Sequence, residues 1–224
     1  MNPFRSLPVA ASGCALLALS LLAPALLHAE DSPHAHHDHG SMQPMAEGGD
    51  DPHAHHRAMM QQEGYKRSEQ QVAVPALELV DMQGQPVAID ALLAEDGPVM
   101  LTFIFTTCTT ICPVLSATFS QVQQELGPEA ADVRLISVSI DPEQDTPEQL
   151  RIYAKRYKAG DNWQFLTGQL GDIIAVQEAF NAYRGDKMNH EPLTFIRTAA
   201  DAPWVRLEGF ASASEIIAEY RQLR

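Results

Sequence analysis

Segments of two kinds alternate along the chain from Val72 to the C-terminus. Short apolar runs of strand length are followed by longer stretches in which apolar residues recur with helical spacing. This alternation restricts the fold more than any other feature, because it allows only a few packed α/β architectures. We expect strands at residues 76–80, 85–89, 99–105, 133–140, 193–197 and 204–208, and helices at residues 113–126, 146–157, 170–183 and from 213 onward.

Start signals support the predicted helices, and a turn supports the first pair of strands. Thr146 is followed by a first-turn proline and by Gln149, and Ser212 is followed by Glu215, a spacing typical of a helix N-terminus. The tetrad 81–84 is typical of a turn between paired strands. The order of strand, helix, strand, helix, β-hairpin and terminal helix predicts a thioredoxin-like α/β domain with an additional N-terminal β-hairpin at residues 72–224.

The N-terminal segment, residues 1–29, has the layout of a secretory signal. A single cation, Arg5, precedes an apolar run rich in Leu and Ala, and this run ends at the small residue Ala29 before Glu30. Pro24 and Ala29 favour cleavage, whereas an uncleaved run of this length would anchor the chain in the membrane. In either case we expect the rest of the chain in the periplasm, soluble or tethered to the inner membrane.

Residues 30–71 are polar, show no helical or strand period, and predict a disordered leader. The motif Pro-His-Ala-His-His occurs twice in this leader, at residues 33–37 and 52–56. Imidazole suits divalent copper and zinc, and thioether sulfur suits monovalent copper, so we interpret the leader as an auxiliary metal-capture segment. A solubilising linker is the alternative. The candidate auxiliary ligands are His34, His36, His37, His39, Met42, Met45, His53, His55, His56, Met59 and Met60.

Composition excludes several classes of function. The formal net charge of −14 at pH 7 argues against nucleic acid as a partner. The sequence contains no glycine-rich phosphate loop, no Ser-His-Asp arrangement and no paired catalytic carboxylates, so it predicts neither nucleotide chemistry nor hydrolysis. Of its three cysteines, Cys14 lies in the signal segment. The remaining two cannot support a scaffold held by many disulfides.

Cys108 and Cys112 lie between a predicted strand, 99–105, and the helix that we expect to open at Pro113. Unpaired N–H groups and the dipole at a helix N-terminus lower thiol pKa values and favour thiolates, which bind soft metals. A spacing of four puts both sulfurs on one side of a helical turn, where they can share a metal ion or form a disulfide. The spacing alone therefore leaves metal and disulfide chemistry open.

His190 is the only histidine after His56, and it lies in a polar loop just before the strand 193–197. In a thioredoxin-like topology this loop faces the cysteine loop across the edge of the sheet. A surface histidine without a role is the alternative. Two thiolates and one imidazole form a compact soft donor set that suits monovalent copper and, with a weak additional ligand, divalent copper. We therefore predict a copper site formed by Cys108, Cys112 and His190.

Three motifs occur together in the predicted domain. They are Phe-Ile-Phe-Thr-Thr-Cys at residues 103–108 with Cys112-Pro113, Val-Ser-Ile-Asp-Pro-Glu-Gln-Asp-Thr-Pro at residues 138–147, and a later single histidine. In these motifs, and over most of the domain, the chain resembles the Sco/SenC family of copper-binding cytochrome oxidase assembly proteins. The resemblance implies that one copper binds through Cys108, Cys112 and His190. It also implies a role in maturing the dinuclear copper centre of cytochrome oxidase, by delivering copper, by reducing its cysteines, or both.

Three functions remain open at this stage. The first is a copper metallochaperone that serves a cytochrome oxidase-type acceptor and receives its metal from a copper donor chaperone. The second is a thiol–disulfide oxidoreductase or peroxidase, and the third is a periplasmic copper buffer whose main ligands lie in the leader. The chain departs from the family pattern in the segment 109–111 and at Pro192, which leaves the balance between these functions open. Asp141 and Asp145 are interpreted as turn and helix-cap residues, and lining the site from the neighbouring loop is the alternative.

Overall fold

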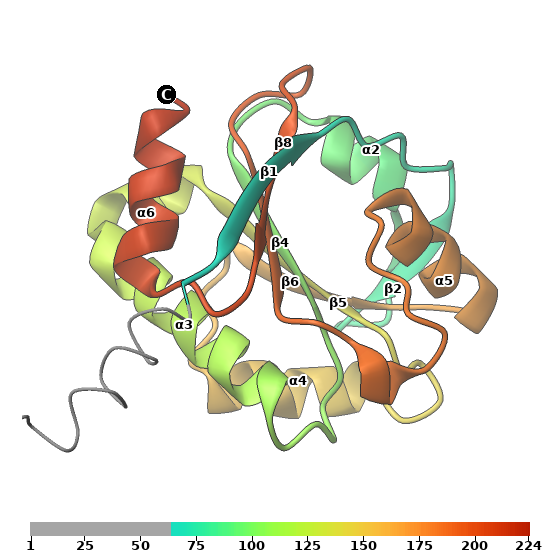
Figure 1. Ribbon diagram of the computed structural model, residues 1–224. Coiled ribbons are helices and arrows are strands. Elements are labelled where there is room, and N and C mark those ends of the chain that lie inside the picture. Colours follow the sequence, from blue (N-terminus) through green and yellow to red (C-terminus); the bar gives the residue numbers. More distant parts are fainter. Residues whose placement is uncertain (1–63) are drawn as a thin grey trace, which may run out of the picture. The chain divides into compact units, whose positions relative to one another are not determined.

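The computed structural model describes residues 64–224, in which eight strands form one mixed sheet (Figure 1). Their order in the sheet is β1-β8-β7-β4-β5-β6-β2-β3. β4, β5 and β6 run parallel to one another, and the strands on either side of them pair antiparallel. The predicted signal segment and the predicted leader up to residue 63 lie outside the described residues. The strands are β1 (Lys66–Gln70), β2 (Glu78–Asp81), β3 (Pro86–Ala88), β4 (Val99–Ile104), β5 (Arg134–Ser139), β6 (Trp163–Thr167), β7 (Leu193–Arg197) and β8 (Trp204–Glu208).

Helices cover both faces of this sheet. Figure 1 shows α3 and α6 against one face and α2 and α5 against the other. The prediction of a thioredoxin-like α/β domain is confirmed, and β2 and β3 form the additional N-terminal hairpin. The helices are α2 (Ile89–Ala94), α3 (Ile111–Leu126), α4 (Pro147–Arg156), α5 (Leu170–Ala179) and α6 (Ala213–Gln222), with short 3-10 helices η1 (Gly127–Asp132) and η2 (Lys187–Asn189).

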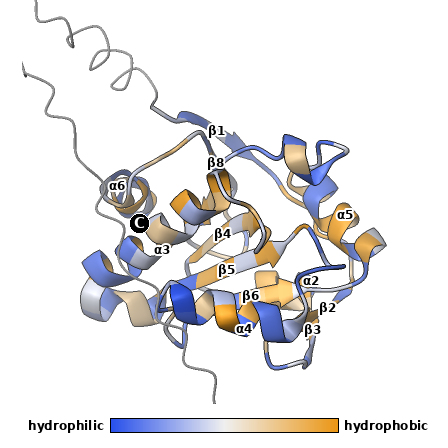
Figure 2. Ribbon diagram, turned by 90° about the horizontal axis from the view of Figure 1, so that it is seen from below, coloured by the Kyte–Doolittle hydropathy of each residue, from blue (hydrophilic) through white to orange (hydrophobic). Residues whose placement is uncertain are grey.

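The central strands carry the core. Every residue of β4 is buried, as are all residues of β5 except Arg134. Helices on both faces require strands that are apolar on both faces, and Figure 2 shows β4 and β5 largely in the apolar colours. These two strands end at the same edge of the sheet, so the loops that follow them have a rigid support. Within residues 64–224, no helix combines the length and apolar character needed to span a membrane.

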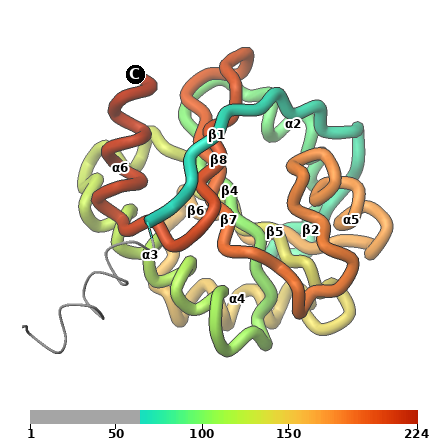
Figure 3. Tube along the Cα trace, in the orientation of Figure 1, coloured from blue at the N-terminus to red at the C-terminus, as the bar shows by residue number. Residues whose placement is uncertain are grey.

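β1 corrects the predicted extent of the leader, because it falls within residues 30–71. It pairs with β8 along its whole length, and the two strands lie side by side in Figures 1 and 3. Four of its five residues are exposed, so the sequence carries no apolar alternation that would reveal a strand. Polar contacts stabilise this region instead, since Tyr65 Oη and Arg67 Nε both donate to the Glu219 carboxylate, at 2.7 and 2.8 Å.

Two further elements were not predicted from the sequence. Trp163 and Phe165 are buried and lie on β6, which continues the parallel part of the sheet. α2 occupies only six residues directly after the hairpin. In addition, α3 begins at Ile111 rather than at Pro113. Proline is tolerated throughout the first helical turn, because the N–H groups there have no intrahelical partner.

Candidate metal centre

Strand pairing brings the cysteine loop and the histidine loop together. Cys108 follows the carboxyl end of β4, and His190 precedes the amino end of β7. Because β7 runs antiparallel to β4, these two strand ends are neighbours, with Thr102 opposite Thr194. Thr102 Oγ1 also donates to the Leu193 carbonyl at 2.9 Å, which fixes the start of β7 against β4.

The three predicted ligands of the folded domain meet at this edge of the sheet. One donor atom from each of Cys108, Cys112 and His190 lies within 4.8 Å of the other two. His190 Nε2 is 3.3 Å from Cys112 Sγ, and the Cys112 N–H donates to Cys108 Sγ at 3.4 Å. Both cysteines are free thiols, with Cys112 buried and Cys108 only partly buried. The candidate auxiliary ligands of the leader, from His34 to Met60, lie outside the described residues.

The imidazole of His190 is oriented for ligation through Nε2. Its Nδ1 is 2.8 Å from the Lys187 carbonyl oxygen, an acceptor, so Nδ1 carries the proton and donates it. This leaves the Nε2 lone pair facing the sulfurs, an arrangement common for metal-binding histidines. Burial lowers the pKa of His190 below its usual value, which favours the neutral ring that a metal requires. Phe105 packs edge-on against the ring, with centroids 5.1 Å apart.

The two thiols differ in acidity. Partial burial acts to raise the pKa of Cys108, but hydrogen bonds from the Cys112 N–H and from Thr110 outweigh it, so this pKa is lower than usual. Burial raises the pKa of Cys112 far above its usual range, despite a hydrogen bond from the Phe105 N–H at 3.3 Å. The prediction that the helix N-terminus lowers both thiol pKa values is therefore right for Cys108 and wrong for Cys112.

Asp145 positions the cysteine loop and does not have the helix-cap role that was favoured from the sequence. Rather than capping α4, whose N-cap is Thr146, its buried carboxylate accepts from the Thr106 N–H at 3.1 Å and from Ser139 Oγ at 2.6 Å. Thr106 lies two residues before Cys108, so Asp145 holds the start of the cysteine loop. The short spacing between Asp141 and Asp145 was visible in the sequence, but a turn explains this spacing equally well.

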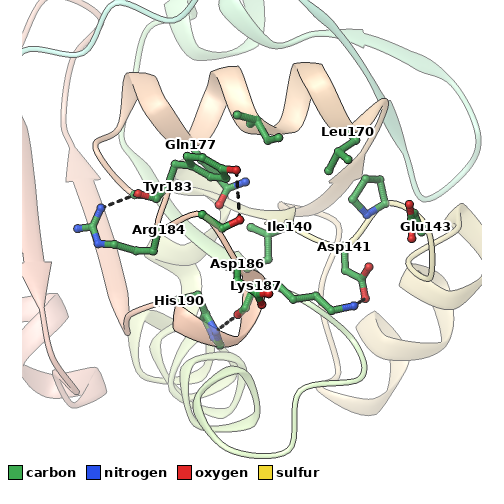
Figure 4. Close-up of a pocket in the computed structure, with 14 residues that line it drawn as sticks. Ile140, Asp141, Glu143, Leu170, Gln177, Tyr183, Arg184, Asp186, Lys187 and His190 are labelled. Carbon is green, nitrogen blue, oxygen red and sulfur yellow. Dashed lines mark hydrogen bonds and ion pairs between the residues drawn. The ribbon is translucent and has the colours of Figure 1, made fainter.

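Asp141 forms an ion pair with the loop that contains His190. Its carboxylate pairs with Lys187 Nζ at 2.6 Å, and the Lys187 carbonyl accepts from His190 (Figure 4). A pocket of about 280 Å³ lies beside this contact, between α5 and the loops that contain Asp141 and His190. Neither cysteine lines this pocket, so His190 has the metal site on one side and the pocket on the other.

Replacing Asp145 with Ala is expected to destabilise the domain by about 3 kcal/mol, because the Thr106 N–H and the Ser139 hydroxyl would lose a charged acceptor. Chemical denaturation, with the midpoint and slope fitted together, measures this change. Asp145→Asn keeps an acceptor oxygen and should lose less stability than Asp145→Ala. A midpoint for Asp145→Ala equal to that of the original chain would show that these hydrogen bonds do not secure the loop.

Comparison with known proteins adds to this geometry. The chain matches the SCO1/SenC family over residues 65–223. It is 46% identical over 89 residues to the SCO1 protein homolog of Bacillus subtilis (strain 168), which covers 39% of this chain and 45% of that protein. It is 35% identical over 111 residues to a putative copper-binding protein of Stutzerimonas stutzeri, covering 48% and 51%. The chain thus spans about half the length of these curated relatives.

Solved structures agree with the family match. BsSco, a member of the Sco family of cytochrome c oxidase assembly proteins with an identified disulfide switch, matches with a TM-score of 0.58 and 30% identity, covering 70% of this chain and 95% of BsSco. ScoI of Bradyrhizobium japonicum, solved with copper bound, shares the fold with a TM-score of 0.55 and 24% identity, covering 66% of this chain and 96% of ScoI. From the family match and the likeness to BsSco together, the chain belongs to the SCO1/SenC family.

Proposed function

We propose that this protein is an exported copper metallochaperone that carries one copper ion between Cys108, Cys112 and His190. The observation that supports this most strongly is the convergence of two sulfurs and one imidazole nitrogen within 4.8 Å at the end of a rigid sheet. Copper is the cargo of the proposed reaction. Thiolate and imidazole ligands together suit monovalent copper, whereas magnesium and calcium require hard oxygen ligands, which these three side chains do not supply.

The donor set also suits a site that must release its metal. Cys108 is partly exposed and has the lower thiol pKa, so it is the ligand that an incoming or outgoing partner reaches first. Cys112 is buried, and its high pKa means that its proton must leave when metal binds. Copper binding should therefore release protons. It should become stronger as pH rises from mild acid, because protons compete with the metal for the two sulfurs and the imidazole nitrogen.

We propose a cytochrome c oxidase-type copper protein as the acceptor and a copper chaperone as the donor. The support is the family membership together with BsSco, whose family is that of cytochrome c oxidase assembly proteins. The domain presents Cys108 in the loop after β4 and Cys112 in the first turn of α3, and these thiols could be shared with the ligands of a partner during transfer. We also propose a periplasmic location, soluble or tethered to the inner membrane, and the support is the signal-like segment at residues 1–29.

The asymmetry of the two thiols supports a second candidate, thiol–disulfide exchange with the acceptor. A thiolate at Cys108 can attack an acceptor disulfide, forming a mixed disulfide and releasing one acceptor thiolate. Cys112, once deprotonated, then attacks Cys108, which releases the second acceptor thiolate and leaves the Cys108–Cys112 disulfide. Two electrons pass to the acceptor in this sequence. No bond to the imidazole forms or breaks in this sequence, whereas copper ligation uses Nε2 directly, so His190 separates the two functions.

Replacing His190 with Ala is expected to abolish copper transfer while leaving thiol exchange within about tenfold of the original rate. The experiment incubates the copper-loaded chain with a reduced dithiol acceptor domain and measures copper in the separated acceptor. A second arm mixes the reduced, metal-free chain with the oxidised acceptor and follows acceptor thiols. Undiminished copper transfer by His190→Ala would contradict the proposed carrier. Loss of both activities in Asn189→Ala, the exposed neighbour, would show that the loop rather than the imidazole is responsible.

The leader is proposed to raise the local copper concentration near the site. Tethered weak ligands act through effective concentration and need no new contact with the domain. The ordinary pKa of an imidazole is about 6.5, so mild acid is expected to protonate the seven leader histidines between His34 and His56 and to displace their metal. Burial lowers the pKa of His190, so that imidazole stays neutral to lower pH.

Lowering the pH from about 7.5 to about 5.5 is therefore expected to strip the leader of copper and to spare one equivalent at the cysteines. Copper titrations of the full chain at both pH values measure this loss. The matched control is a chain in which the leader histidines are replaced by glutamine, and it should bind one equivalent at both pH values. Extra equivalents that persist unchanged in acid would contradict copper capture by the leader histidines.

A further inference from the structure

An uncharged groove lies beside the metal centre, between the first half of α3 and the connection from β8 to α6. Its volume is about 510 Å³, and it is lined by Pro113, Val114, Ala117, Phe210 and Ala211 together with three uncharged polar side chains. Val114 and Phe210 are each 46% exposed, although both are large apolar residues. Exposed apolar side chains that gather around a groove are typical of a surface that binds another segment.

The described chain begins at one end of this groove. β1 pairs with β8 in the register Lys66 opposite Glu208, so Gly64 and Tyr65 lie next to Gly209. A side chain at Gly209 would meet the Tyr65 Cα at 3.1 Å and the Gly64 oxygen at 3.2 Å, which shows how closely the two backbones approach. Phe210 is the next residue. In Figures 1 and 3, the start of β1 lies beside the connection from β8 to α6.

The residues that precede Gly64 suit this groove in length and chemistry. The segment 57–63 reads Arg-Ala-Met-Met-Gln-Gln-Glu, with Met60 four residues before Gly64. Four extended residues span at most about 14 Å, and Phe210, the residue after Gly209, already lines the groove. Methionine is flexible and polarisable, fills irregular apolar gaps, and makes favourable contacts with aromatic rings such as Phe210.

We propose that residues 57–63 dock into this groove, with Met59 and Met60 seated against Val114 and Phe210. The groove and the metal centre share the first turn of α3, where Cys112 and Pro113 are consecutive. The proposal concerns the chain without metal, so its test does not depend on whether the chain carries copper.

The test uses the full metal-free chain with isotope-labelled methionine methyl groups. Nuclear Overhauser contacts are expected from Met59 or Met60 to the Val114 methyls and the Phe210 ring. Phe210→Ala should remove these contacts and shift the Met59 and Met60 methyl signals to the positions of Met42 and Met45, which serve as internal references. Val114→Ser should do the same, so the result does not depend on one variant folding well.

Leu170→Ala is the matched control, because Leu170 is an exposed apolar residue on α5, away from the groove. It should leave the Met59 and Met60 signals unchanged. Methyl signals of Met59 and Met60 that already coincide with those of Met42 and Met45 in the original chain would overturn the proposal. Contacts that disappear on dilution would also overturn it, since they would assign the groove to a second copy of the chain.

Discussion

Alanine in place of Cys108, Cys112 or His190 is expected to weaken copper binding by about 100-fold or more. Loss of a residue that only supports a ligand costs 10- to 100-fold, so loss of a ligand itself should cost at least the upper value. The three donors form a minimal set within 4.8 Å, and no other histidine or cysteine of residues 64–224 can replace a missing one. Competition with a chromophoric chelator of monovalent copper measures each affinity on the full chain.

The three variants should differ in how strongly each substitution disturbs the folded structure. Cys112→Ala removes a buried thiol and leaves a small cavity at the N-terminus of α3, so its free energy of unfolding should be measured alongside its affinity. His190→Ala removes a half-buried ring and tests ligation with less structural disturbance. Asn189→Ala, adjacent and exposed, is the matched control and should keep full affinity. A His190→Ala chain that competes for copper as well as the original would contradict a three-ligand site.

Oxidation of the two cysteines is expected to abolish copper loading at the site altogether. A disulfide between Cys108 and Cys112 leaves sulfurs that are far poorer ligands than thiolates. Forming it transfers two electrons to an oxidant such as a small-molecule disulfide and releases two protons. The two sulfurs already lie within 4.8 Å, and the loop between them is exposed at Thr109 and Thr110, so they can approach to the bonding distance of about 2.05 Å.

Mass spectrometry under non-denaturing conditions, followed by alkylation, distinguishes the states. Each chain should carry either one copper or the disulfide, and never both. To remove the leader's contribution, a chain in which only the leader histidines are replaced by glutamine, with His190 retained, is measured in parallel. Treatment with a thiol reductant should restore one equivalent of copper. A copper-loaded population whose cysteines resist alkylation as an intact disulfide would show that at least one sulfur is dispensable.

The sequence predicted the strands and helices whose signals are local. β4 is a continuous apolar run, and α4 and α6 open with Thr146 and Ser212 as side-chain caps, the latter within a complete capping box. β1 escaped prediction because the segment Lys66–Gln70 is polar and exposed, and it is a strand only by virtue of pairing with β8. A strand at a sheet edge needs no apolar pattern, so tertiary contact rather than propensity decides it.

The site shows the same division between local and non-local information. The cysteine spacing and the single histidine were visible in the sequence, and the antiparallel pairing of β4 with β7 brings them together. The high pKa of Cys112 was not visible, since it results from burial by the whole core rather than from the helix N-terminus. The contact of Asp145 with Thr106 joins residues 39 positions apart, which no local pattern encodes.

X-ray absorption at the copper edge of the loaded chain tests the central claim most directly, because it counts the ligand atoms around the metal. The sample is the chain with leader histidines replaced by glutamine, loaded with one equivalent of monovalent copper. The proposed site predicts two sulfur neighbours and one imidazole nitrogen, and in His190→Ala the nitrogen contribution alone should disappear. A first shell that contains only nitrogen and oxygen, or one that His190→Ala leaves unchanged, would contradict copper binding by Cys108, Cys112 and His190.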